Sequence, residues 1–320
     1  MERARRTPGV SAASGRIPFR AKPMLAMLVR DPFHRPGWVY EEKYDGYRIL
    51  AYKEGRRVRL LSRNDNDRTA AFVDVARAVQ DLPTRTLLLD GEVAAFDPRG
   101  VSRFQLLQQG RAPRSYVVFD CLYKNGKDLR REPLPVRRTA LEAVVGVRGT
   151  VHRARRMAAN GVAAYRAAKR RGFEGIIAKD TAAPYIEGRS NKWLKVKVRQ
   201  EDEFVIGGYT APQGARTQFG ALLLGAYDRH GRLRYVGKVG TGFTARTLAS
   251  LYRMFRPLAR RTPPFENPPR ERGATYVEPR LVAQIAYEEW TADRKLRQPA
   301  FLGLRDDKNA RDVVLPAATS

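Results

Sequence analysis

The alternation of apolar and polar residues divides most of the chain into two series of predicted elements. In the first series, runs rich in β-branched and aromatic residues are bounded by turn residues and predict strands. These runs are 38–52, 57–62, 86–96, 116–123, 175–179 and 193–198. Apolar residues at helical spacing predict helices at 72–80, 135–145 and 162–171. Because several connections between strands are short, we expect a mixed α+β domain with antiparallel sheets.

A second series of strands follows the short acidic segment 199–203. It consists of predicted strands at 204–209, 221–227, 233–238 and 281–290, with one helix at 244–255. A few strands interrupted by a single helix are typical of a small Greek-key β-barrel of the OB type. The predicted organisation is therefore a disordered basic arm at 1–20, a first domain at 21–198, a hinge at 199–203, a barrel domain at 204–315 and a tail at 316–320.

The net charge of the chain indicates the class of its partner. Lys and Arg number 61 against 33 Asp and Glu, which leaves a formal charge of +28. A field of that sign attracts polyanions and steers their approach, so we expect a nucleic-acid partner. The alternative is an arginine-rich composition that only keeps the protein soluble.

The contents of cysteine and histidine limit the metal chemistry. One cysteine, Cys121, excludes an internal disulfide and is typical of a reducing cytosol. With three scattered histidines, no Cys/His zinc site is expected, so carboxylates must hold any metal, as suits Mg²⁺ or Mn²⁺. No apolar run is long enough to cross a membrane, and residues 1–20 lack the apolar centre of a signal peptide. We expect a soluble cytoplasmic protein.

The segment Lys43-Tyr44-Asp45-Gly46 contains the strongest candidate nucleophile. A lysine amine can attack phosphorus once its pKa falls from about 10.4. Attack on phosphorus would form a phosphoramidate and expel a leaving group from that phosphorus. Nearby cations would lower the pKa of the amine, whereas the neighbouring carboxylates of Glu41, Glu42 and Asp45 would raise it. The same four residues also suit an ordinary surface turn, since Asp-Gly is a common hairpin turn.

Five further segments of chemical character follow this lysine in a fixed order. They are Ser62-Arg63-Asn64, then 89–93 with Glu92, 118–120 with Phe119, 173–179 with Glu174 and Lys179, and 192–197. In the last of them Lys195 and Lys197 alternate along a predicted strand, so both project from the same face. Both lysines could steady charge on a phosphate, and the alternative is an exposed basic strand.

In this order the segments resemble the motifs of the covalent nucleotidyltransferases, which include ATP-dependent DNA ligases, RNA ligases and capping enzymes. The flanking segments 38–48, 184–190 and 296–308 are similar to the ligase module of bacterial ligase D, the end-joining ligase. The resemblance extends over residues 20–315. It implies a nucleotidyltransferase (adenylation) domain with antiparallel sheets, followed by an OB-fold domain.

The resemblance also implies a role for each candidate residue. Lys43 would accept AMP from ATP, with catalytic support from Arg48, Lys195 and Lys197. For the nucleoside, Glu41 and Phe119 would recognise adenine, and Arg48 and Arg63 would contact the ribose and phosphates. Glu174 would bind a metal, and Glu92 would bind the ribose or the metal. Lys179 would contact a phosphate, while Arg305 and Lys308 would orient the β,γ-phosphates. From the residues alone, Phe119 is equally a core residue. The alternatives are structural salt bridges for Glu92 and Glu174, and a salt-bridged segment at 305–308.

The function that this resemblance implies is an ATP-dependent DNA ligase of the bacterial cytosol that works in DNA repair or end joining. Its cofactors would be ATP and Mg²⁺ or Mn²⁺. Its partners would be duplex DNA with nicks or breaks and a Ku-type end-binding protein, and we expect a monomer. The alternatives within the enzymes are an RNA ligase and a GTP-dependent capping enzyme. The alternative of another class is a non-catalytic, basic DNA-binding protein on a ligase fold.

Overall fold

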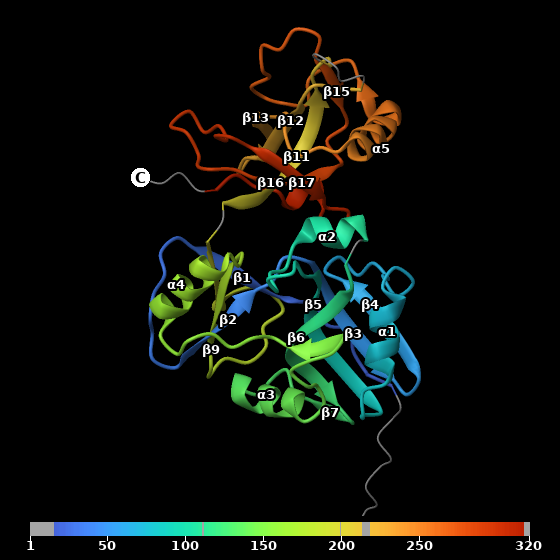
Figure 1. Cartoon of the computed structure of the whole chain (residues 1–320), viewed down its shortest axis with the longest axis vertical. Helices are drawn as coiled ribbons and strands as arrows, with labels where there is room; N and C mark the ends of the chain where they lie inside the picture. Colours follow the sequence, from blue (N-terminus) through green and yellow to red (C-terminus); the bar gives the residue numbers. More distant parts are fainter. Residues whose placement is uncertain (1–15, 111, 199, 213–217, 317–320) are drawn as a thin grey trace, which may run out of the picture. The chain divides into compact units, whose positions relative to one another are not determined.

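The computed structural model describes residues 16–110, 112–198, 200–212 and 218–316, and the chain forms two compact units (Figure 1). Unit 1 comprises Met1–Arg103 and Ala112–Val196, and unit 2 comprises Phe104–Arg111 and Lys197–Ser320. Most of the predicted arm and tail lies outside the described residues. However, Ile17 N donates to the Glu54 carboxylate at 2.7 Å, so the chain is already packed onto unit 1 before residue 20.

The first sheet of unit 1 has four strands in the order β1-β10-β9-β2. Their bounds are Met24–Val29 (β1), Gly188–Lys197 (β10), Gly175–Asp180 (β9) and Trp38–Lys43 (β2). β2 and β9 are antiparallel and pair Lys43 with Gly175. β1 and β10 are parallel, so this sheet is mixed, and the parallel pair was not predicted. The helix α4 (Gly161–Arg171) packs on β9 and β2 (Figure 1). The Asn160 side chain caps its first turn.

The second sheet of unit 1 has the order β4-β3-β5-β6-β7, with β8 also paired to β6. Its strands are Tyr47–Glu54 (β3), Arg57–Ser62 (β4), Thr86–Ala95 (β5), Arg114–Lys124 (β6), Lys127–Asp128 (β7) and Val151–Arg153 (β8). The helices α1 (Val73–Gln80) and α3 (Leu134–Glu142) pack against this sheet. The long strand predicted at 38–52 is therefore two strands, β2 and β3, in different sheets, because the chain turns at 44–46.

Glycine is required at position 46 because the backbone there lies very close to β5. A Cβ atom at Gly46 would overlap the carbonyl oxygen of Val93. Gly91 of β5 is similarly enclosed, since a Cβ there would lie 2.6 Å from the Tyr116 ring and from Val117 O. Only glycine fits such close backbone approaches. These contacts fix the path of the chain immediately after Lys43.

Unit 2 is the barrel that the second series of strands predicted. Its strands are Glu201–Tyr209 (β11), Leu222–Tyr227 (β12), Leu233–Val239 (β13), Ala259–Arg260 (β14), Thr275–Val277 (β15), Val282–Ala286 (β16) and Ala300–Leu304 (β17). β11 is central and pairs with β12, β15 and β16. The helix α5 (Ala245–Phe255) buries Leu248, Leu251 and Phe255 in a continuous apolar core, and the short 3₁₀ helices Arg256–Leu258 (η1) and Ala310–Asp312 (η2) complete the unit.

Several further elements differ from the predicted ones. The helix α2 (Phe104–Gln109) was not predicted, and it belongs to unit 2 although it lies between β5 and β6 in the sequence. β11 begins at Glu201, so the described part of the predicted hinge is mostly strand, while residue 199 lies outside the described residues. β16 ends at Ala286, four residues short of its prediction, and β14, β15 and β17 were not predicted.

Within the described ranges, no helix is long and apolar enough to cross a membrane.

Candidate active site

Lys43 is the last residue of β2, and its ammonium forms an ion pair with the Glu174 carboxylate. The contact follows from the strand register, because Lys43 is paired with Gly175, the residue after Glu174. The two side chains are 19% and 8% exposed, so the amine is sheltered but accessible. Glu41 and Lys43 lie on the same face of β2, since side chains alternate along a strand. The fold thus brings together the predicted nucleophile and a predicted metal-binding carboxylate.

Glu41 lies at the centre of a second group of predicted site residues. One of its carboxylate oxygens is 2.7 Å from Lys179 Nζ, and the other forms an ion pair with Arg138. Lys179 Nζ is also 4.8 Å from the centroid of the Phe119 ring. Burial lowers the pKa of the Lys179 ammonium well below its usual value, although the nearby Asp120 carboxylate opposes this shift. Glu41, Lys179 and Phe119 therefore converge, as the motif order predicted.

Arg48 is held by a carboxylate that the sequence reading did not single out. Its Nε and Nη2 donate to the two oxygens of Asp90 at 2.6 and 2.7 Å, and Tyr185 donates to the same carboxylate at 2.6 Å. Burial alone would lower the pKa of Arg48, but Asp90 raises it above the ordinary value. The guanidinium lies 4.4 Å from the centroid of the Phe119 ring. Its suggested action on the Lys43 amine stays a prediction.

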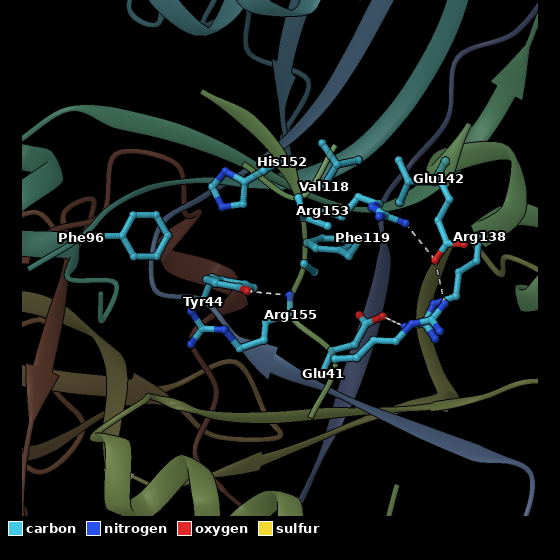
Figure 2. Close-up of a pocket in the computed structure, with 14 residues that line it drawn as sticks. Glu41, Tyr44, Phe96, Val118, Phe119, Arg138, Glu142, His152, Arg153 and Arg155 are labelled. Atoms are coloured by element: carbon cyan, nitrogen blue, oxygen red, sulfur yellow. Dashed lines mark hydrogen bonds and ion pairs between the residues drawn. The ribbon is translucent and has the colours of Figure 1, made fainter. Parts of the chain in front are cut away.

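A cavity of about 460 Å³ in unit 1 is lined by Glu41 and Phe119 together with several cations. Figure 2 shows Glu41 and Phe119 at this cavity, with Arg138, Arg153 and Arg155 around it. The rest of its lining is Tyr44, Phe96, Val118, Leu141, Glu142, Val147, His152, Ala154 and Arg156. An aromatic face, a buried carboxylate and surrounding arginines suit a planar, anionic ligand such as a nucleotide. The sequence reading missed these arginines, although the density of basic residues at 153–156 was a signal.

Glu42 points to the other face of β2 and has an unusual environment. Burial raises its pKa to about 7, even though Arg155 Nη1, 3.1 Å from the carboxylate, lowers it. The neighbouring Tyr44 also has a raised pKa, chiefly through burial, and its hydroxyl accepts a hydrogen bond from Arg155 N. The side of β2 opposite the nucleophile is thus sensitive to pH near neutrality.

The remaining predicted residues of unit 1 are placed by their strands. Glu92 on β5 is directly opposite Arg48 on β3, Lys195 on β10 is opposite Leu28 of β1, and Arg63 lies in the turn after β4. Within the part of the chain that the structure describes, no group of three or more His, Cys, Asp or Glu residues could hold a metal ion. Mg²⁺ commonly takes one or two carboxylates and completes its shell with substrate phosphates. Glu174 and Glu92 fit that pattern only together with a nucleotide.

The other predicted residues lie in unit 2, where each forms an ion pair. Lys197 Nζ is 2.6 Å from the Asp202 carboxylate, and Lys308 Nζ is 3.2 Å from Glu203. Arg305 forms a two-pronged ion pair with Asp307. Residues 305–308 therefore form the salt bridges of the alternative interpretation, and their action on phosphates stays a prediction.

Comparison with known proteins links both parts of the chain to one family. Residues 23–197 match the model described as ATP dependent DNA ligase domain, and residues 215–308 match the ATP dependent DNA ligase C terminal region. The chain is 40% identical over 317 residues to the multifunctional non-homologous end joining protein LigD of Pseudomonas aeruginosa, a match covering 95% of this chain and 38% of that protein. For LigD of Mycobacterium tuberculosis (strain H37Rv) the identity is 38% over 285 residues, covering 87% and 37%. The chain spans less than two-fifths of the length of these relatives.

Solved structures give the same result. The mycobacterial DNA ligase D complexed with ATP and MES superposes with a TM-score of 0.69 at 34% identity, covering 92% of this chain and 98% of that one. The ligase domain of M. tuberculosis LigD gives a TM-score of 0.50 at 33% identity, with the same coverage. The resemblance to ligase D and the expected pair of folds are confirmed.

Proposed function

Because this chain belongs to the family of ATP-dependent DNA ligases, we propose that it seals breaks in duplex DNA through AMP carried on Lys43. One observation carries the proposal for the site. Lys43 contacts Glu174 and lies on the same strand face as Glu41, which lines a cavity together with Phe119. These contacts support a nucleophile at the end of β2 that lies beside a candidate metal ligand and on the same strand face as a residue of the candidate base-binding pocket.

The reaction consists of three transfers of a nucleotidyl group. The Lys43 amine, after losing a proton, forms a bond to the α-phosphorus of ATP, and the bond from that phosphorus to pyrophosphate breaks. An oxygen of the DNA 5′-phosphate then takes the AMP, which frees Lys43. The 3′-hydroxyl finally attacks the activated 5′-phosphate, forms the phosphodiester and releases AMP.

The remaining candidate residues bind and orient the nucleotide in this proposal. Glu41 and Phe119 hold adenine, by hydrogen bonding and stacking respectively. The phosphates and ribose are held by Arg48, Arg63, Lys179, Lys195 and Lys197, while Arg305 and Lys308 orient the leaving pyrophosphate. Fixed cations of this kind stabilise charge that develops in the transition state. Glu174 and Glu92 would hold Mg²⁺ or Mn²⁺, whose charge neutralises phosphate oxygens.

The proposed physiological role is end joining of broken DNA. It rests on the names of the two LigD relatives, both described as non-homologous end joining proteins, and on the net charge of +28. A Ku-type end-binding protein is the proposed protein partner. The chain matches less than two-fifths of the length of those relatives. We therefore propose the role in end joining separately from the sealing reaction.

A sealing assay tests the proposed activity. Wild type, Lys43→Ala and the control Lys127→Ala are incubated with ATP, divalent cation and a duplex that contains a single nick. Lys127 suits the control because its side chain is 63% exposed on β7, in a pair with Glu132. We expect sealing by wild type and Lys127→Ala only, and only when the nick carries a 5′-phosphate. Equal sealing by Lys43→Ala would overturn the proposal, and preferential sealing of nicked RNA would favour an RNA ligase.

A further inference from the structure

The guanidinium of Arg305 is held through its three nitrogen atoms inside unit 2. Its Nε and Nη2 donate to the two oxygens of Asp307 at 2.8 Å each, and its Nη1 donates to Gln284 at 2.8 Å. The side chain of Arg305 is 7% exposed, and that of Asp307 is 3% exposed. A planar fork of this kind holds the edge of the guanidinium that faces the carboxylate.

One flat face of the same guanidinium is covered by an aromatic ring. The central carbon of the Arg305 guanidinium lies 4.4 Å from the centroid of the Phe104 ring, and Phe104 is 1% exposed. A cation over an aromatic face is attracted most strongly when both groups are shielded from water. Phe104 therefore supplies a contact that the in-plane hydrogen bonds cannot replace.

The Phe104 ring belongs to α2, and α2 contacts β17, the strand that ends immediately before Arg305. Gln108 Nε2 of α2 donates to the carbonyl of Leu304, the last residue of β17. A Cβ atom on Gly303 would overlap the Gln108 side chain, so the helix lies directly against β17. α2 is thus a part of unit 2 that is built from sequence between two strands of unit 1.

We propose that Phe104 is a positioning residue for Arg305 in the first nucleotidyl transfer. The inference rests on the proposed function, in which Arg305 orients the pyrophosphate that leaves ATP. Asp307 and Gln284 fix the edges of the guanidinium, and the Phe104 ring fixes its plane. Loss of the ring leaves the plane free to tilt, and small errors of orientation reduce the rate of a positioned reaction. The second and third transfers involve no pyrophosphate, so they do not depend on Phe104.

The test measures the first and third transfers separately on the full chain. The first is followed as formation of lysyl-AMP from α-labelled ATP, and the third as sealing of a nick that already carries AMP on its 5′-phosphate. The variants are Phe104→Leu and Phe104→Ala, with Arg305→Ala as the reference. We expect both Phe104 variants to slow the first transfer about ten-fold, as loss of a shielded cation–π contact implies, and to leave the third within about two-fold. Arg305→Ala should show the same selectivity with a larger effect.

Phe219→Leu is the matched control, because it makes the same change at a 0% exposed phenylalanine in the core of unit 2. It should alter the two transfers equally. Thermal unfolding of every variant identifies one that fails to fold, and Phe104→Leu, which keeps most of the buried volume, then decides the outcome. Equal slowing of both transfers by Phe104→Leu, or an unchanged first transfer, would overturn this inference and leave the proposed function intact. A wild type that forms no lysyl-AMP would overturn the proposed function with it.

Discussion

Three consecutive side chains on β2 have three different ionic environments. Glu41 contacts Lys179 and Arg138, Lys43 contacts Glu174, and Glu42 faces Arg155 from the opposite side of the strand. The sequence shows only that acidic groups flank the lysine, which would oppose its activation. In the structure each flanking glutamate has its own cationic partner, so its charge is partly compensated before it acts on Lys43.

Glu42 predicts a pH-dependent stability. Burial raises its pKa to about 7 from 4.5, so the folded protein binds this proton more tightly than the unfolded chain. Stability from this group is therefore fully present below pH ~4.5 and is lost as pH rises to ~7. We expect Glu42→Gln to stabilise the protein at pH ~8 by on the order of 1–3 kcal/mol and to have little effect at pH ~5.

Thermal unfolding of wild type and Glu42→Gln across this pH range measures the effect. Glu187→Gln is the control, since Glu187 is also in an ion pair with an arginine but is 36% exposed. Its unfolding temperature should follow wild type at every pH. A constant difference between wild type and Glu42→Gln from pH 5 to pH 8 would show that Glu42 does not titrate there.

The order of motifs predicted some of the residues of unit 1 that meet. Lys43 with Glu174, and Glu41 with Lys179 and Phe119, are grouped as expected. The partners Asp90, Arg138 and Arg155 were missed, because each lies on an element distant in sequence: a strand, a helix and a loop, respectively. Nothing in the local sequence distinguishes these residues from others of the same charge.

At the level of elements, the sequence predicted long strands and amphipathic helices well. α5, predicted at 244–255, is observed at Ala245–Phe255 with Thr244 as its cap. Short elements were missed, because α2 has six residues and β14 only two, too few to show a periodicity. The parallel pairing of β1 with β10 was also missed, since an apolar pattern does not specify the direction of a partner strand.

The turn after β2 predicts a strict requirement for glycine at position 46. In Gly46→Ala the new Cβ would overlap the Val93 carbonyl, so β3 or β5 must shift. We expect a loss of about 1–3 kcal/mol in the free energy of unfolding, as for an overpacked core, and slower formation of lysyl-AMP because Lys43 is displaced.

Gly146→Ala is the control for Gly46→Ala, because the new Cβ would lie 3.9 Å from the nearest backbone atom, Arg148 O. Urea unfolding and lysyl-AMP formation should both resemble wild type for this control. An unchanged free energy of unfolding in Gly46→Ala would contradict this prediction, because β3 and β5 could then move apart without loss of stability.

The charge of the whole chain predicts how it binds DNA. A protein of net charge +28 should bind duplex DNA largely by displacing counterions from phosphates. We expect its affinity for nicked duplex to fall at least about a hundred-fold between ~50 and ~200 mM NaCl, linearly on a double-logarithmic plot. Fluorescence anisotropy with a labelled duplex measures this slope. An affinity that is independent of salt would contradict a phosphate-dominated interface.

The location of AMP on the protein decides whether Lys43 is the nucleophile. The chain is incubated with α-labelled ATP and Mg²⁺ or Mn²⁺, digested, and analysed by mass spectrometry. We expect one AMP, attached to Lys43, and complete loss of label in Lys43→Ala. Absence of label from the wild type, label on another lysine, or label that persists in Lys43→Ala would contradict it.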